Sequence, residues 1–209
     1  MKKADAIWAI NDRVDGVYSD LRGFVYIRKH NLQNSKEQIG GGNITQAMAL
    51  FSLLNFLAKI QYFLDKNGAI QLKDLGEPDI IEENAFIHLI RKVDSEDINL
   101  GLPTNDTNTL KLVWSGFRNK LAHVSNVEFG KQVMVCVIGD PNDSLTVSEI
   151  LEKVKDKQAF EHDGDFRNWR VNADILLANI PRIKQIVVEQ IHNANQDTLD
   201  YKLLEKVIG

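Results

Sequence analysis

The stretch TQAMALFSLLNFLAKIQYFLDK, residues 45–66, is the most apolar segment of this 209-residue chain and decides its fold. Its apolar residues recur at steps of three and four, which predicts an α-helix. They also cover most of the helix circumference, so more than one face has to be buried. We therefore expect this helix at the centre of a helical bundle or at the seam of a dimer.

Helical patterns also occupy most of the remaining chain. Apolar residues three or four apart predict helices on both sides of the central one, and capping residues mark several of the ends. The helix that follows residue 104 begins near Asn105 or Asp106, both good N-cap residues. The other expected helices cover residues 4–30, 78–93, 166–193 and 199–207, with Pro181 as a kink in the helix of 166–193.

The segment that follows the fourth helix has a different character. Residues 131–138 are apolar and β-branched, residues 140–143 form a strong turn signal, and residues 145–147 can return as a short strand. This order predicts a β-hairpin. Thr146 and Glu149 also fit a capping box, which would instead begin a helix that runs to about residue 157.

Charge and cysteine content limit the possible functions. The net charge is −4 at pH 7 and the sequence pI is about 5.7, which excludes broad, non-specific coating of nucleic acid. Cys136 is the only cysteine, so the chain has neither an internal disulfide nor a Cys-rich zinc site. No stretch reaches about 20 uncharged apolar residues and no apolar signal core is present at the start. We expect a cytoplasmic protein that does not contact a membrane.

A candidate site lies at the end of the fourth helix, in the sequence WSGFRNKLAH at residues 114–123. It combines Arg118, Asn119 and His123. An Arg-Asn pair followed by a histidine at one of three allowed spacings is expected by chance about 0.05 times in a chain of this composition. An imidazole can move a proton near neutral pH, and a guanidinium can hold phosphate oxygens. Cationic residues in the last turn of a helix are also favoured by the helix dipole alone, without any catalytic role.

Helix geometry does not bring the three side chains to one point. Asn119 and His123 are four residues apart and lie within about 40° of each other on the helix. Arg118 precedes His123 by five residues, which places it about 140° away. The small Ala122 leaves room for the long arginine to bend, and we expect the helix to fray or end near His123.

The run Arg118-Asn119-Lys120-Leu121-Ala122-His123 resembles the signature of HEPN domains, a helical family rich in metal-independent ribonucleases. The resemblance implies RNA as substrate and Arg118, Asn119 and His123 as catalytic residues, with no metal and no cofactor. It also implies a homodimer in which two motif helices share one cleft. DNA should not be cleaved, because it lacks the 2′-hydroxyl group.

Two further expectations depend on this resemblance. Lys111, Lys120 and Lys131 flank the motif and are the candidates for steering phosphate groups toward it. One subgroup of HEPN toxins has a tyrosine two residues after the histidine, and a partner nucleotidyltransferase modifies it. This chain has Ser125 there, which argues against that version of the system.

The sequence therefore predicts a mainly α fold, with an HEPN-like helical bundle at residues 1–127. A small β-hairpin and additional C-terminal helices, residues 128–209, pack on that bundle. The first functional hypothesis is a metal-independent endoribonuclease, in a toxin or phage-defence setting with a possible antitoxin or other protein partner. The second is a non-catalytic module that binds nucleotides or a protein partner. A basic cleft around Arg118 would favour the first.

Two other groups of residues carry chemistry but are better explained without a site. The polar break at residues 161–165 contains acids and His162 but lacks the register of a metal-binding loop, so we expect a solvated acidic loop. His88, inside the third helix, is expected to be a packed or surface histidine.

Overall fold

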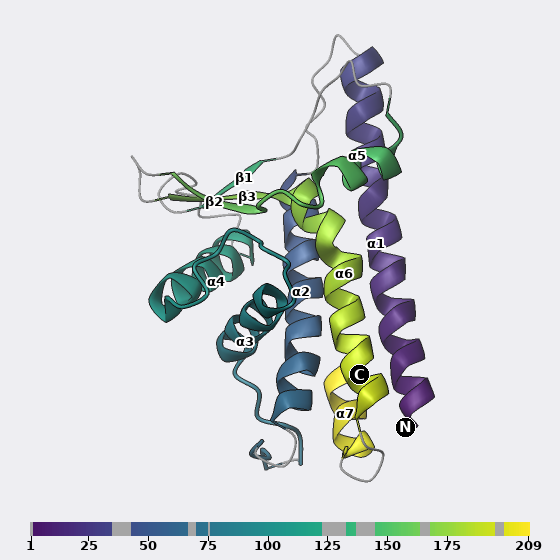
Figure 1. Ribbon diagram of the computed structural model, residues 1–209, viewed down its shortest axis with the longest axis vertical. Coiled ribbons are helices and arrows are strands. Elements are labelled where there is room, and N and C mark those ends of the chain that lie inside the picture. Colours follow the sequence, from purple (N-terminus) through teal and green to yellow (C-terminus); the bar gives the residue numbers. More distant parts are fainter. Residues whose placement is uncertain are drawn as a thin grey trace.

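The computed structural model describes residues 2–34, 43–66, 70–74, 76–122, 133–136, 145–163, 168–194 and 199–209. Within these ranges the fold is mainly helical, as predicted (Figure 1). The helices are α1 (Lys3–Asn34), α2 (Asn43–Asp65), α3 (Glu82–Ser95), α4 (Thr107–Ala122), α5 (Val147–Val154), α6 (Ala173–Asn193) and α7 (Tyr201–Ile208). The strands are β1 (Val133–Cys136), β2 (Phe160–Asp163) and β3 (Asn168–Asn172).

Helix α2 lies at the centre of the bundle. It contacts α1, α3, α4, α6 and α7, and its side chains Leu50, Leu54 and Leu57 are completely buried. The predicted position of α2 at the bundle centre is thus confirmed, and contacts within one chain bury most of its apolar side chains. By length and composition, residues Thr45–Asp65 form the one helix of the described chain that could cross a membrane, yet 56% of that window is buried inside the fold.

Helix α6 connects the two halves of the sequence. In Figure 1 it runs alongside α1 and α2 and lies between them, while α3 and α4 lie on the other side of α2. Its buried side chains, Leu176, Ile180 and Ile183 among them, belong to the same hydrophobic cluster as those of α1 and α2. Residues 1–127 and 128–209 therefore share one core.

The predicted hairpin is wrong in its pairing. Strand β1 does not pair with residues 145–147 but runs parallel to β3, which in turn pairs antiparallel with β2, giving the order β1-β3-β2. Thr146 instead caps α5, because its side chain accepts a hydrogen bond from the backbone N–H of Glu149, and the Glu149 carboxylate accepts one from the backbone N–H of Thr146. The predicted capping box is thus confirmed.

Strand β3 replaces what was predicted to be the first turns of the long C-terminal helix. Trp169 and Val171 are buried whereas Arg170 between them is exposed, which is the period-two alternation of a strand. Asn172 then caps α6, because its side chain accepts hydrogen bonds from the backbone of Asp174 and Ile175. The expected solvated acidic loop is also wrong in part, since residues 160–163 form β2.

Helix α3 starts four residues later than predicted. Pro78 was expected in its first turn but forms an isolated β-bridge with Leu72, and α3 begins at Glu82. The bridge closes a turn in which Gly76 has φ of +70°, a conformation that favours glycine. Apart from the start of α6, which lies seven residues after the predicted one, the other expected ends lie within four residues of those observed, and Asp106 caps α4 as predicted.

Candidate functional site

Residues 118–122 of the motif occupy the end of α4, a helix whose start is well determined by local chemistry. The Asp106 carboxylate accepts hydrogen bonds from the backbone of Asn108 at 3.0 Å and Thr109 at 3.2 Å, which satisfies two free N–H groups of the first turn. Leu110, Val113 and Trp114 then form the buried face. The Trp114 ring lies 5.1 Å from that of Phe86 in α3, which fixes α4 against its neighbour.

The helix brings some of the predicted site residues together. Arg118, Asn119 and Lys120 follow one another in α4, and position 118 comes one turn after the buried Trp114. Position 119 comes one turn after Ser115, which is exposed. The side chains of these three residues, together with His123 and Lys131, lie outside the described part of the structure.

Lys111 is the one predicted phosphate-steering residue with a described side chain. It is exposed and its Nζ lies 3.2 Å from Oε1 of Glu83 in α3. Positions 111 and 118 are seven residues apart, so they share one face of α4 at a separation of about 10 Å. The ion pair with Glu83 compensates the charge of Lys111, which weakens its contribution to attracting phosphate.

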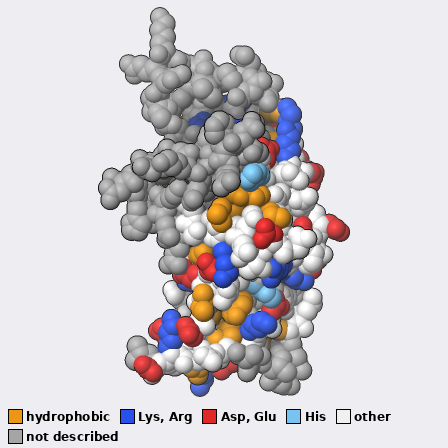
Figure 2. Space-filling model, turned by 90° about the vertical axis from the view of Figure 1, so that its left-hand side faces the viewer, with side chains coloured by type: hydrophobic (Ala, Val, Ile, Leu, Met, Phe, Trp, Pro, Cys, Tyr) orange, Lys and Arg blue, Asp and Glu red, His pale blue; other side chains and the backbone are white. Residues whose placement is uncertain are grey.

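The same pairing of charges extends over the surface on that side of the molecule. Figure 2 shows Lys and Arg side chains interspersed with Asp and Glu rather than gathered into one patch in the part that is coloured. Glu82 of α3 pairs with Lys59 at 2.7 Å, and Lys92 pairs with Glu96 one turn later. The described part of this face therefore offers a mixed rather than a basic surface to a partner.

A buried polar network joins α1, α2 and α6. Asp174, which has no exposed surface, accepts hydrogen bonds from the guanidinium of Arg28 and from Nε2 of Gln46, the latter at 3.0 Å. Arg28 also donates to the Gln46 side-chain oxygen and is only 8% exposed. A carboxylate and a guanidinium that are removed from water each require an opposite charge nearby. The Arg28–Asp174 pair, together with Gln46, therefore links the three helices at one defined position.

Sequence reasoning missed this network, although part of the signal was present. Arg28 follows Leu21 and Val25 at steps of four and three, so it continues the apolar face of α1. A charged residue at such a position needs a buried partner. Asp174 gives a weaker signal, because an acid in the first turn of a helix is already favoured by the helix dipole.

A second polar cluster gathers at the end of α2. His88 of α3 hydrogen-bonds through Nε2 to the carboxylate of Asp65, which also accepts hydrogen bonds from Gln61 at 2.8 Å and from Gln190 of α6. The Tyr62 ring meets the His88 ring edge-on, with 5.6 Å between centroids. His88 is thus a half-buried residue that bridges two helices, in agreement with the prediction for it.

Asp65 has an altered acidity for a clear reason. Burial raises the pKa of its carboxyl group, but the hydrogen bonds from His88, Gln61 and Gln190 outweigh this effect and lower the pKa to about 2. The carboxylate is therefore held in its charged form, which suits a structural acceptor.

Neither cluster has the composition of a metal site. Among the residues that the structure describes, no group of three or more His, Cys, Asp or Glu side chains is placed to hold a metal ion. His162, from the acidic segment of the sequence, packs edge-on against Trp169 across the β2–β3 pair, at 5.2 Å between ring centroids. The imidazole of His162 therefore has a packing role there.

Comparisons with known proteins add no relatives. No protein-family model, no curated protein and no solved structure matches this chain.

Proposed function

We propose that this chain is a metal-independent endoribonuclease whose site lies at the C-terminal end of α4. The observation that carries the proposal is the sequence Arg118-Asn119-Lys120-Leu121-Ala122-His123 together with the bounds of α4. The helix includes the motif as far as Ala122, and His123 is the next residue. The described helix carries Arg118 and Asn119, and the resemblance to HEPN domains supplies the roles proposed for them and for His123.

The chemistry needs only the substrate and the three side chains. His123 removes the proton from the 2′-hydroxyl of RNA, and the 2′-oxygen attacks the adjacent phosphorus. The bond from phosphorus to the 5′-oxygen breaks, and that oxygen takes up a proton from a histidine or from water. Arg118 stabilises the negative charge on the non-bridging oxygens, and Asn119 orients the phosphate or the imidazole. The products are a 2′,3′-cyclic phosphate and a 5′-hydroxyl end.

A complete site in this proposal requires two chains. Arg118 and His123 diverge by about 140° on one straight helix, so residues from two copies of the motif helix supply one cleft. The described contacts of α2 bury most of its apolar side chains within one chain, although Met48 stays exposed, so its apolar surplus is a weaker argument for a dimer than the motif geometry. The homodimer therefore rests on the geometry of the motif and on the resemblance.

A cleavage assay tests this function directly. Purified protein is incubated in EDTA with an RNA oligonucleotide and with the same oligonucleotide carrying deoxyribose at the scissile position. We expect only the first to be cut, with cyclic phosphate at the new 3′ end. Cleavage that needs magnesium, or that proceeds on the deoxy-substituted oligonucleotide, would rule out this mechanism even though the chain would still be a nuclease.

One observation favours the second function, a non-catalytic module that binds nucleotides or a protein partner. The described surface beside the motif carries mixed charges, and Lys111 is already paired with Glu83. Such a surface suits a protein partner better than a polyanion. The absence of both binding and cleavage of RNA by the folded protein would favour this alternative.

A further inference from the structure

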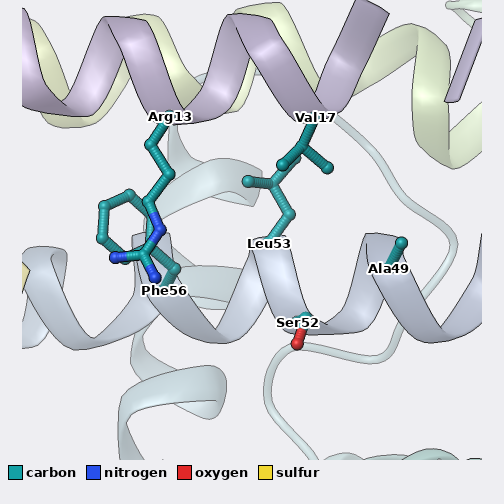
Figure 3. Close-up of a pocket in the computed structure, with 6 residues that line it drawn as sticks. All are labelled: Arg13, Val17, Ala49, Ser52, Leu53 and Phe56. Atoms are coloured by element: carbon teal, nitrogen blue, oxygen red, sulfur yellow. The ribbon is translucent and has the colours of Figure 1, made fainter. Parts of the chain in front are cut away.

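A pocket lies between α1 and α2, apart from the motif and from both polar clusters. Its volume is about 360 Å³, and it is lined by Arg13, Val17, Ala49, Ser52, Leu53 and Phe56. Figure 3 shows Val17 and Leu53 facing each other across the gap between the two helices, with Arg13 over Phe56 at one end and Ala49 toward the other. This volume is within the range of sites that hold small organic ligands.

The pocket is apolar along its length and cationic at one end. Its walls are the aliphatic side chains of Val17, Ala49 and Leu53 and the ring of Phe56. From Phe56 to Ala49 the wall formed by α2 extends over seven residues, which corresponds to about 10 Å. Arg13 is the one charged residue of the lining.

Arg13 is held in place from two sides. Its guanidinium carbon lies 4.6 Å from the centroid of the Phe56 ring, and Nη1 donates a hydrogen bond of 2.8 Å to the carbonyl of Ile208 at the end of α7. Both contacts fix the plane of the guanidinium group, while Arg13 as a residue remains exposed. A guanidinium has five N–H donors, so the bond to Ile208 leaves donors for a carboxylate.

We propose that this pocket binds a small amphipathic carboxylate, with the carboxylate on Arg13 and an alkyl chain along Val17, Leu53 and Ala49. Charge complementarity selects an anion at the arginine, and the apolar walls select an alkyl body. An alkyl chain of medium length matches the extent of the wall. The pocket does not depend on the nuclease proposed above, and either idea can fail without the other.

Decanoate is the probe, used below the concentration at which it forms micelles. Binding to the full chain is measured by isothermal titration calorimetry beside decanol and decyltrimethylammonium, which share the alkyl chain but lack the negative charge. We expect decanoate to bind at least about tenfold more tightly than either, because a charge-assisted hydrogen bond distinguishes them. Equal affinity for all three, or no heat with decanoate, would overturn the proposal.

Two variants locate the site. Arg13→Gln should weaken decanoate binding at least about tenfold, whereas Lys202→Gln on the exposed side of α7 removes the same charge and should leave it unchanged. Ala49→Phe should abolish binding by filling the pocket while Arg13 is kept. Circular dichroism checks that each variant folds. Unchanged affinity in both Arg13→Gln and Ala49→Phe would show that decanoate binds elsewhere.

Discussion

The buried network of Arg28, Gln46 and Asp174 provides the sharpest test of what holds the three central helices together. In Asp174→Leu the guanidinium of Arg28, only 8% exposed, loses the carboxylate that compensates its charge. Removing one partner of a buried pair costs about 3–5 kcal/mol. If the free energy of unfolding falls by about 2 kcal/mol per molar urea, the urea concentration at the unfolding midpoint should fall by about 1.5–2.5 M.

A matched double variant separates the ion pair from simple packing. Arg28→Met combined with Asp174→Leu removes both charges and keeps the volume apolar, so it should be far less destabilising than Asp174→Leu alone. Urea unfolding followed by circular dichroism measures the unchanged protein, Arg28→Met, Asp174→Leu and the double variant. A loss below about 1 kcal/mol in Asp174→Leu, or a double variant at the sum of the single effects, would refute the assignment of the pair as the link between these helices.

Three further outcomes are expected. Gly101→Ala should destabilise the fold by about 2–4 kcal/mol, because Gly101 has φ of +87° and an added Cβ would lie 2.1 Å from the Phe160 carbonyl oxygen. The control is Gly16→Ala, whose Cβ meets nothing within 4 Å and which should stabilise the fold by about 1 kcal/mol. Thermal melts measure both variants. The lowered pKa of Asp65 contributes stability that is complete above about pH 4 and is lost as pH falls toward 2. Asp65→Asn should therefore be less stable than the unchanged protein by about 1 kcal/mol at neutral pH, after allowance for solvent screening. This difference in the free energy of unfolding should shrink between about pH 4 and pH 2 in acid titrations. The chain should sediment as a dimer at micromolar concentration, and Arg118 or His123 changed to cysteine should cross-link across the two-fold axis; a strict monomer would count against a shared cleft.

Sequence patterns predicted the helices better than the sheet, for a physical reason. Each helix leaves its own local signature, such as the steps of three and four in α2 or the capping residues Asp106 and Thr146. The partner of β1 is set by contacts distant in sequence, because Val133 pairs with Trp169. Residues 145–147 are nearer to β1 in the sequence and were predicted to pair with it. Only the capping box at Thr146 argued against that pairing.

The candidate site shows the same division between local and distant information. The position of Arg118 and Asn119 in the last turns of a helix could be predicted, because amphipathic spacing and the cap at Asp106 determine where α4 runs. The pairing of Lys111 with Glu83 could not, since it depends on how α3 packs against α4. The network around Asp174 joins residues almost 150 positions apart in the sequence. Only the apolar residues around Arg28 indicated that this arginine would need a buried partner.

Cleavage of RNA in EDTA by matched variants is the most direct test of the proposed ribonuclease. Arg118→Ala and His123→Ala should each lower the rate by about 10²-fold or more, and Asn119→Ala should have a milder effect. Arg167→Ala is the control and should keep the full rate, because Phe166-Arg167-Asn168 repeats the Phe-Arg-Asn sequence but has Asn172 instead of a histidine five residues after the arginine. All four should melt close to the unchanged protein. Equal activity in Arg118→Ala, His123→Ala and Arg167→Ala, or no cleavage by the unchanged protein, would contradict the account.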